Sequence, residues 1–496
     1  MILETTMALA LMVGGGATMR AAGMRGWGVL PWGLLAGLGM YIVAGSLLVL
    51  LGAPAAPLLA LAATALGGAG LWVWRWRAGD DVRMRGAAVV GGLAGTAAAT
   101  VLLRASGLVT WHVDSLVYTN LGQAIAAGHY VDSVGSYSLS KRLLTVPLMH
   151  APAYYQGEYY VRSITPLIAL ATAGVLAWVV VRACPPEWRR WSGLVGAGAA
   201  VLLLTVPRMM LHAFYVNGHL VTGTVVMAVT GATWLLATRR EVPRTALIVA
   251  VALLLPVAVL TRAEGAILAG IVALPWLVLE GTRRRDRVIV LAAIGVPATA
   301  YYAFATLELL GEQPIEEGGQ GGPAAYAIGL AIGLAALVAA AVATRVDAPA
   351  WLRWTPQVGE IGAWLLLVAL VALKGTEVLV ASAEAAFWSV DPVHGAWGAT
   401  IGILAVVGIV LWAAARIPMV TVLRYSVTTF VPLALLLAYG RDGAYRMDPA
   451  DSLHRMIAQI VPTLVLAVVV AACVAVPRWR ARGVGPKVQA DAQTSS

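Results

Sequence analysis

Apolar runs long enough to cross a membrane recur from one end of this sequence to the other, and they limit the possible folds more than any other feature. Examples are residues 27–52, 245–261 continued by 265–280, and 456–476. A helix of about 18 or more such residues crosses the ~30 Å hydrocarbon core of a bilayer. Because every backbone group in lipid needs a partner, only helices or closed barrels can span it. The runs are continuous rather than alternating, so they predict helices.

The predicted fold is therefore an all-α, polytopic bundle of transmembrane helices. Only 12% of the residues are charged, whereas a soluble domain carries roughly a quarter. About fifteen spans are expected, at residues 4–19, 27–50, 54–74, 86–104, 162–181, 192–207, 219–238, 245–261, 265–280, 288–309, 324–344, 360–381, 395–415, 420–440 and 456–476. No removable signal peptide is expected, since Glu4 precedes the first arginine, Arg20, and a basic n-region is missing.

Arginines gather in alternate loops, and this sets the expected orientation. The clusters are Arg75 and Arg77; Arg189 and Arg190; Arg239 and Arg240; Arg283, Arg284, Arg285 and Arg287; and Arg478, Arg480 and Arg482. This positive-inside pattern predicts a cytoplasmic C-terminus, and an odd number of spans then puts the N-terminus outside. The net charge of +10 follows from these loops, so it does not indicate a nucleic-acid partner.

Ten basic residues remain on the predicted outer side, where acidic residues outnumber them. They are Arg104, Lys141, Arg142, Arg162, Arg208, Arg262, Lys374, Arg441, Arg446 and Arg455. A Lys or Arg near the end of a span ordinarily extends its head group to water, which is expected for about half of them, Arg104 included. The others need an anion on that side of the membrane.

The largest predicted outer loop, residues 105–161, is polar and rich in tyrosine. Within it, residues 115–127 carry apolar side chains at helical spacing, so an amphipathic helix on the outer leaflet is expected, and Gly128 is expected to end it. Three further outer loops are predicted at residues 311–323, 382–394 and 441–455.

Several features exclude other kinds of site. The two cysteines, Cys184 and Cys473, lie at predicted cytoplasmic ends, so neither a disulfide nor a Cys/His metal framework is expected. A Walker A run and a G-x-G-x-x-G after a strand are both missing, so the sequence carries neither of these nucleotide-binding motifs.

Gly14-Gly15-Gly16 lies in a span and indicates close helix packing. The tail from Gly483 is polar and predicted to be disordered.

The segment Trp111-His112-Val113-Asp114-Ser115 opens the large loop and places a carboxylate close to a membrane face. Such a carboxylate is costly to bury unless it is paired or used in a function. The simpler interpretation is that Asp114 or Ser115 caps the helix that follows. The residues themselves leave both interpretations open.

Three stretches together resemble the GT-C superfamily of polytopic glycosyltransferases, which use polyprenyl-phosphate-linked sugars. They are Asp114…Tyr118…Gly128-His129-Tyr130, then Leu260-Thr261-Arg262-Ala263-Glu264-Gly265, and Asp451-Ser452-Leu453-His454-Arg455-Met456. The resemblance is best over residues 86–280, which it implies are a catalytic core. Residues 1–85 would be additional N-terminal helices, residues 281–480 would complete the cavity, and residues 481–496 would form a cytoplasmic tail.

The resemblance implies that Asp114 is the base that activates an acceptor hydroxyl. It further implies that Lys141, Arg142, Arg162, Arg208, Arg262 and Arg455 bind the donor phosphate. Trp111, His112, Tyr118, Glu158, Glu264, Asp451 and His454 would position the substrates. Simpler alternatives stand beside these roles: Arg262 and Glu264 would neutralise each other, and Arg455 would pair with Asp448 or Asp451. Several family members carry paired acids in the first loop, so a second acid here is absent or is one of Asp132, Glu158, Glu384 and Asp391.

The resemblance thus implies a multi-pass protein of a prokaryotic plasma membrane. Its expected activity is inverting transfer of a sugar from a polyprenyl-phosphate donor to a glycan, lipid or protein acceptor on the outer face of that membrane. Mannose or arabinofuranose transfer in cell-envelope assembly is one form of it. One base and a basic pocket suffice for this chemistry, so no cofactor is required, although a divalent metal is compatible with the outer acids. The competing interpretations are a transporter or flippase for lipid-linked glycans, an O-antigen-type polymerase or ligase, and a structural subunit without catalysis. A transporter should carry charges deep within its spans, and here only Lys374 and Glu377 fall inside a predicted span.

Overall fold

The structure is a computed structural model. It describes residues 1–80, 86–110, 112–131, 142–238, 241–279, 282–309, 323–347, 350–415, 420–440, 443–448 and 452–483. Within these ranges all regular structure is helical except for two isolated backbone bridges. The predicted all-α class is confirmed for this part of the chain.

The helices follow one another with short connections. The N-terminal part holds α1 (Ile2–Ala21), η1 (Gly26–Gly28), α2 (Val29–Leu50), α3 (Ala56–Arg77), α4 (Gly86–Ala105), α5 (Val113–Ala127), α6 (Thr145–His150), η3 (Ala151–Gln156) and α7 (Ile164–Ala183). The middle holds η4 (Pro186–Trp191), α8 (Ser192–Thr205), α9 (Pro207–Ala213), α10 (Gly218–Thr238), α11 (Arg244–Val259), α12 (Gly265–Val278), α13 (Arg284–Leu309) and α14 (Pro323–Arg345). The C-terminal part holds η5 (Ala350–Trp354), α15 (Thr355–Lys374), α16 (Glu377–Val390), α17 (Gly398–Ala415), α18 (Val420–Gly440), α19 (Ser452–Met456), η6 (Ile457–Gln459) and α20 (Val461–Gly483).

The chain has many helices able to cross a membrane. In the described residues ten are long and apolar enough, and two bent pairs, one at α8 and α9 and one at α19 and α20, raise the number to twelve. The apolar helices α11, α12 and α17 are shorter. All the predicted spans except 360–381 coincide with a single helix. The number of spans reaches the predicted fifteen only if these three shorter helices also cross.

One predicted span has the wrong bounds. A helix able to cross the membrane covers Leu352–Lys374, but residues 360–381 do not form one helix, because α15 ends at Lys374 and Gly375 has a positive φ of 86°. Lys374 and Glu377 therefore flank a helix break as exposed residues rather than lying inside a span. The loop predicted at 382–394 is also largely wrong, since α16 continues to Val390.

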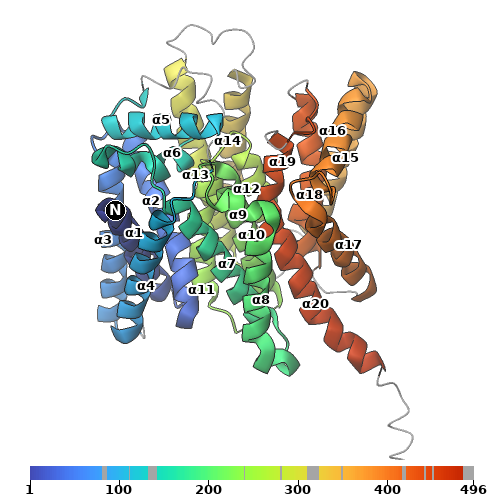
Figure 1. Cartoon of the computed structure of the whole chain (residues 1–496), viewed down its shortest axis with the longest axis horizontal. Coiled ribbons are helices and arrows are strands. Elements are labelled where there is room, and N and C mark those ends of the chain that lie inside the picture. Colours follow the sequence, from blue (N-terminus) through green and yellow to red (C-terminus); the bar gives the residue numbers. More distant parts are fainter. Residues whose placement is uncertain are drawn as a thin grey trace, which may run out of the picture.

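Two short helices lie across one end of the bundle. Most helices run side by side, whereas α5 and α6 lie nearly at right angles to them (Figure 1). We call this end of the molecule the α5 end. The predicted helix at 115–127 is confirmed as α5: Leu121 and Ile125 are buried, Leu116 is exposed, and Gly128, with φ of 81°, ends the helix.

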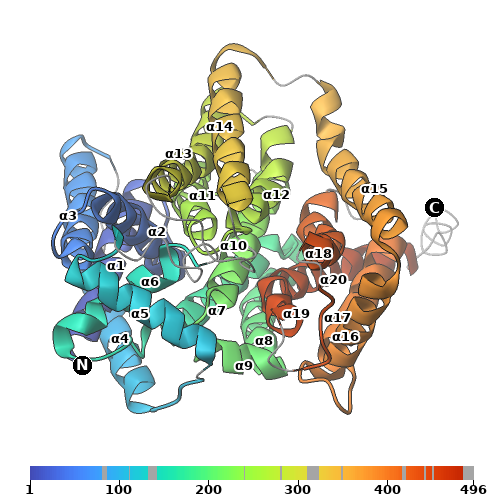
Figure 2. The ribbon, with the colours of Figure 1, turned by 90° about the horizontal axis from the view of Figure 1, so that it is seen from above.

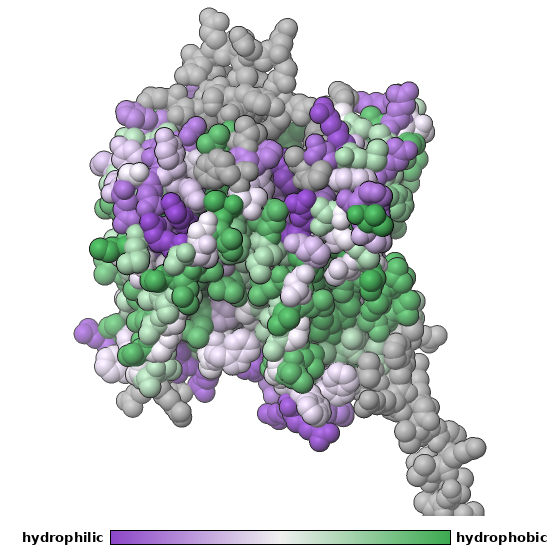
Figure 3. Space-filling model, in the orientation of Figure 1, coloured by the Kyte–Doolittle hydropathy of each residue, from purple (hydrophilic) through white to green (hydrophobic). Residues whose placement is uncertain are grey.

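The surface has the pattern of a membrane protein. On the face drawn in Figure 3, a hydrophobic band separates hydrophilic residues at the α5 end from hydrophilic residues at the opposite end. Seen from above, α10 lies near the centre, surrounded by other helices (Figure 2). Its apolar stretch is 89% buried, against 11% for the peripheral α15. Peripheral helices thus present their apolar side chains to the surroundings, as lipid contact requires.

Glycines bring the N-terminal helices close together, as predicted for Gly14-Gly15-Gly16. A Cβ atom on Gly14 would overlap the backbone of Thr64 in α3, and one on Gly15 would overlap the backbone of α2 at Gly33 and Gly37. These contacts pack α1 tightly between its neighbours, and Glu4, near the start of α1, lies beside Ser163.

Candidate functional site

The N-terminus of α5 is capped by His112, not by Asp114 or Ser115 as the simpler interpretation expected. The backbone N–H of Asp114 donates to His112 Nδ1 at 3.2 Å, and the backbone N–H of His112 donates to Ser115 Oγ at 3.3 Å. Because this reciprocal arrangement satisfies the helix start, the carboxylate of Asp114 is not used as a cap.

The carboxylate of Asp114 instead binds two arginines, one on each oxygen. Arg142 Nη2 donates to Oδ1, and Arg455 Nη1 donates to Oδ2. Arg455 Nη1 also donates to the hydroxyl of Tyr215 at 3.1 Å. The side chains of all three charged residues are only 14–16% exposed. We call Asp114, Arg142, Arg455 and Tyr215 the Asp114 cluster.

Backbone pairing between distant segments assembles this cluster. The segment before α5 pairs with the segment after α9 at Thr110 and Tyr215, and Ser115 Oγ donates to the carbonyl of Val216 at 3.2 Å. The segment before α6 pairs with the α11–α12 connection at Arg142 and Arg262. Arg455 comes from α19 and follows Asp114 by 341 residues in the sequence.

Arg262 and Glu264 border the Asp114 cluster and neutralise each other, with Nε and Oε1 2.6 Å apart. The predicted pairing of these two residues is therefore present. Tyr118 lies one helical turn after Asp114, and the guanidinium of Arg142 lies 5.6 Å from the centre of its ring. The ring is fully buried, and its hydroxyl makes no hydrogen bond to a described residue.

Among the described residues, the charges around Asp114 do not balance. The three arginines Arg142, Arg262 and Arg455 face the two carboxylates of Asp114 and Glu264, so these five residues carry one net positive charge. Burial raises the pKa of Asp114, but the charges of Arg455 and Arg142 and their hydrogen bonds outweigh burial and hold the pKa below its ordinary value. Asp114 is therefore ionised at neutral pH.

A second group of charged residues lies at the α5 end and includes a residue that the sequence analysis did not select. Glu4 of α1 is 4% exposed and accepts a hydrogen bond from Arg104 Nη1. It also accepts bonds from Ser163 Oγ at 2.6 Å and from the backbone N–H of Ser163 at 3.1 Å. Arg104 Nη2 in turn lies 2.5 Å from Glu158 Oε1. We call Glu4, Arg104, Glu158 and Ser163 the Glu4 cluster.

The Glu4 cluster changes two expectations. Arg104 does not simply extend to water, so that expectation is wrong, because two carboxylates hold it. The hydrogen bond from Arg104, together with its charge, lowers the pKa of Glu158. Glu4 stands alone as an acid near the start of an apolar span, and an ionisable residue in that position marks a partner or a function. That signal was available in the sequence.

The remaining predicted residues are distributed around these two clusters. Arg162 is 4.0 Å from Glu158 and donates its backbone N–H to Glu4, so it belongs with the Glu4 cluster. Arg208, in α9, is half-buried and has no ion pair with a described residue. The ring of His454 packs against Trp388 and Trp397, and its carbonyl accepts from Trp397 Nε1 at 2.7 Å. Trp111, Lys141 and Asp451 lie outside the described residues.

None of the described candidates for the second acid forms an ion pair or hydrogen bond with the Asp114 cluster. Glu158 binds Arg104, Glu384 is exposed on α16, and Asp391 Oδ2 lies 2.8 Å from His394 Nδ1. Asp132 lies outside the described residues. Across the described ranges, no group of three or more His, Cys, Asp or Glu residues is arranged to hold a metal ion.

Comparison of the chain with protein-family models, with curated proteins and with solved structures found no match.

Proposed function

We propose that the chain is an inverting glycosyltransferase that moves a sugar from a polyprenyl-phosphate donor to an acceptor hydroxyl on the outer face of the plasma membrane. The observation that carries this proposal is the Asp114 cluster, in which a single carboxylate lies between two arginines at the α5 end of a membrane bundle. The resemblance to GT-C transferases, described above, names the same aspartate.

The roles follow from the chemistry of the transfer. The acceptor oxygen forms a bond to the anomeric carbon while the bond from that carbon to the phosphate oxygen breaks, and the electron pair leaves with the phosphate. Asp114 would take the proton of the acceptor hydroxyl. Arg142 and Arg455 would bind the phosphate and stabilise the charge that develops on it. No protein acid is needed for a phosphate leaving group.

The two ion pairs of Asp114 also suggest an order of events. While both of its oxygens accept hydrogen bonds from arginines, the carboxylate is a poor base. A donor phosphate offers the same guanidinium groups a better bidentate partner. Binding of the donor would therefore draw at least one arginine away from Asp114 and free an oxygen to accept the proton, so the donor would bind before transfer begins.

The experiment is transfer by the purified protein in liposomes, with a panel of polyprenyl-phosphate sugars and a membrane-lipid extract as acceptor. We expect release of free polyprenyl phosphate, detected by mass spectrometry, from at least one donor. Asp114→Asn should lower the rate roughly a hundredfold or more, because the base is lost.

The matched control is Asp286→Asn. Asp286 is also a buried aspartate paired with an arginine, Arg244, with Nη2 and Oδ2 2.5 Å apart. It lies at the start of α13, next to the start of α11. The 16 residues of α11 separate this pair from the α5 end, a length of about 24 Å in a helix. Equal release by wild type and Asp114→Asn would remove Asp114 as the base, and no release from any donor would argue against the reaction itself.

A further inference from the structure

A second concave site lies on the opposite side of α5 from the Asp114 cluster. Residues four apart on a helix share a face, as Asp114 and Tyr118 do. Residues two apart, such as Tyr118 and Asn120, point to different sides. Asn120 and Gln123 are three apart and share a different face of α5. Burial agrees with this division, since Tyr118 is fully buried and Asn120 is exposed.

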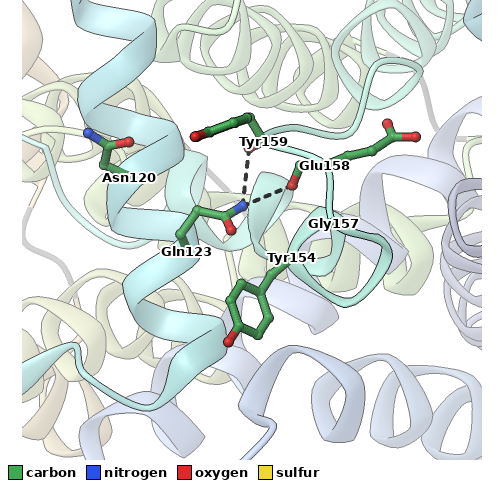
Figure 4. Close-up of a pocket in the computed structure, with 6 residues that line it drawn as sticks. All are labelled: Asn120, Gln123, Tyr154, Gly157, Glu158 and Tyr159. Carbon is green, nitrogen blue, oxygen red and sulfur yellow. Dashed lines mark hydrogen bonds between the residues drawn. The ribbon is translucent and has the colours of Figure 1, made fainter.

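The site is a cavity of about 530 Å³ between this face of α5 and the turn that follows η3. Its described lining consists of Asn120, Gln123, Tyr154, Gly157, Glu158 and Tyr159. Figure 4 shows the rings of Tyr154 and Tyr159 on either side of Gln123, while the carboxylate of Glu158 points away from that amide. The volume lies within the ordinary range for small-molecule sites, roughly 300–1,000 Å³.

Hydrogen bonds hold the cavity in shape. Gln123 Nε2 donates to the carbonyls of Glu158 and Tyr159, at 3.0 and 3.4 Å. The hydroxyl of Tyr155 donates to the carbonyl of Ala126 at 3.2 Å. Gly157 turns the chain with φ of 69°, a conformation that disfavours any larger residue. The turn is therefore fixed to α5, and the cavity is formed before a ligand binds.

The exposed groups have a definite chemical character. Tyr154 and Tyr159 are 43% and 65% exposed as whole residues. The amide of Asn120 makes no hydrogen bond to a described residue, and the amide NH₂ of Gln123 is used by the turn, which leaves its oxygen as an acceptor. The described lining holds no aliphatic side chain and no cation, and its one carboxylate already binds Arg104.

We propose that this cavity binds a carbohydrate chain. A sugar ring combines an apolar C–H face, which packs on a tyrosine ring, with hydroxyls that pair with amides. A phosphate or an anionic lipid headgroup would need a cation, and an acyl chain or an apolar peptide would need aliphatic lining. The proposal does not depend on the transfer reaction, since the cavity faces away from Asp114.

The test is equilibrium binding of fluorescently labelled mannan-, arabinan- and glucan-derived hexasaccharides to the purified full chain in detergent, by fluorescence polarisation. We expect at least one of them to bind. Asn120→Ala and Tyr159→Ala should each weaken binding about fivefold or more, and Tyr159→Phe, which keeps the ring, should weaken it less. Asn120 is an exposed surface residue, so its variant should fold normally.

A control variant separates this site from its surroundings. Leu116→Ala removes an exposed side chain from α5 outside the cavity, and it should bind the hexasaccharides as the wild type does. Binding without transfer activity would support this site while refuting the proposed reaction. No binding of any hexasaccharide, or binding unchanged in Asn120→Ala and Tyr159→Ala, would overturn the proposal.

Discussion

The Asp114 cluster and the Glu4 cluster both pair carboxylates with arginines, but they differ in their balance of charge. In the described residues, one carboxylate of the first cluster binds two arginines. In the second, Glu4 and Glu158 both bind Arg104, and Arg162 lies 4.0 Å from Glu158, so the charges are equal in number. Glu4 also accepts hydrogen bonds from Ser163, so its oxygens are fully used inside the protein. The comparison shows that ion pairs alone do not distinguish the two clusters, and that the balance of charge in the described residues does; on the proposed function, this balance separates an anion-binding site from a structural clamp.

The largest expected difference between the clusters is in activity. Arg455→Ala should lower the rate of polyprenyl-phosphate release by about a hundredfold to a thousandfold, because it removes a cation from the developing phosphate charge. Arg104→Ala should leave the rate per folded molecule unchanged. The rates are measured in liposomes and normalised to folded protein by size-exclusion chromatography. Similar losses in both variants would break the functional distinction between the clusters.

The next effect is on stability and falls on the other cluster. Glu4→Gln should reduce the free energy of unfolding by about 3 kcal/mol, because it leaves Arg104 with one carboxylate fewer in a buried place. Ser163→Ala should cost less, about 1 kcal/mol, since it removes one hydrogen bond. Denaturant titration in mixed micelles measures both. A Glu4→Gln protein as stable as the wild type would show that α1 is not clamped through this residue.

A smaller effect should appear when an anion is added. Inorganic phosphate should raise the melting temperature of the wild type, with a stabilisation of about 0.4 kcal/mol when its concentration equals its Kd. The shift should be larger in Asp114→Asn, where two arginines have lost their carboxylate, and absent in Arg142→Ala. Chloride at equal ionic strength is the control. A shift that is the same in all three proteins would place the anion elsewhere.

The smallest effect is the pH dependence of the Asp114 ion pairs. Because the folded protein lowers the pKa of Asp114 below 3.8, these pairs stabilise the fold at pH values above 3.8 and lose their effect as the pH falls through the lower, folded pKa. The difference in melting temperature between the wild type and Asp114→Asn should be constant from pH 5 to pH 8 and shrink below pH 3.8. A difference that already shrinks between pH 7 and pH 5 would contradict the lowered pKa.

The sequence predicted what repeats or lies close together in the chain. Apolar runs located the helices that match the predicted spans, and apolar spacing with a terminal glycine located α5. Arg262 and Glu264 could be paired because they lie only two residues apart. It did not predict that Arg142 and Arg455 share one carboxylate, because no local pattern relates residues so far apart. The break at Gly375 was missed because a glycine inside an apolar run is tolerated in a helix, and only the backbone shows that φ is positive there.

The distance along the chain between Asp114 and Arg455 has a consequence for synthesis. Arg142 follows Asp114 by 28 residues, whereas Arg455 follows it by 341. At a translation rate of roughly 5–20 residues per second, the ribosome adds Arg455 roughly 20 to 70 s after Asp114. During that interval the nascent protein contains Asp114 and Arg142 but not Arg455. A chain cut short before α19 therefore contains nearly all of the helices and still lacks the second arginine that binds Asp114.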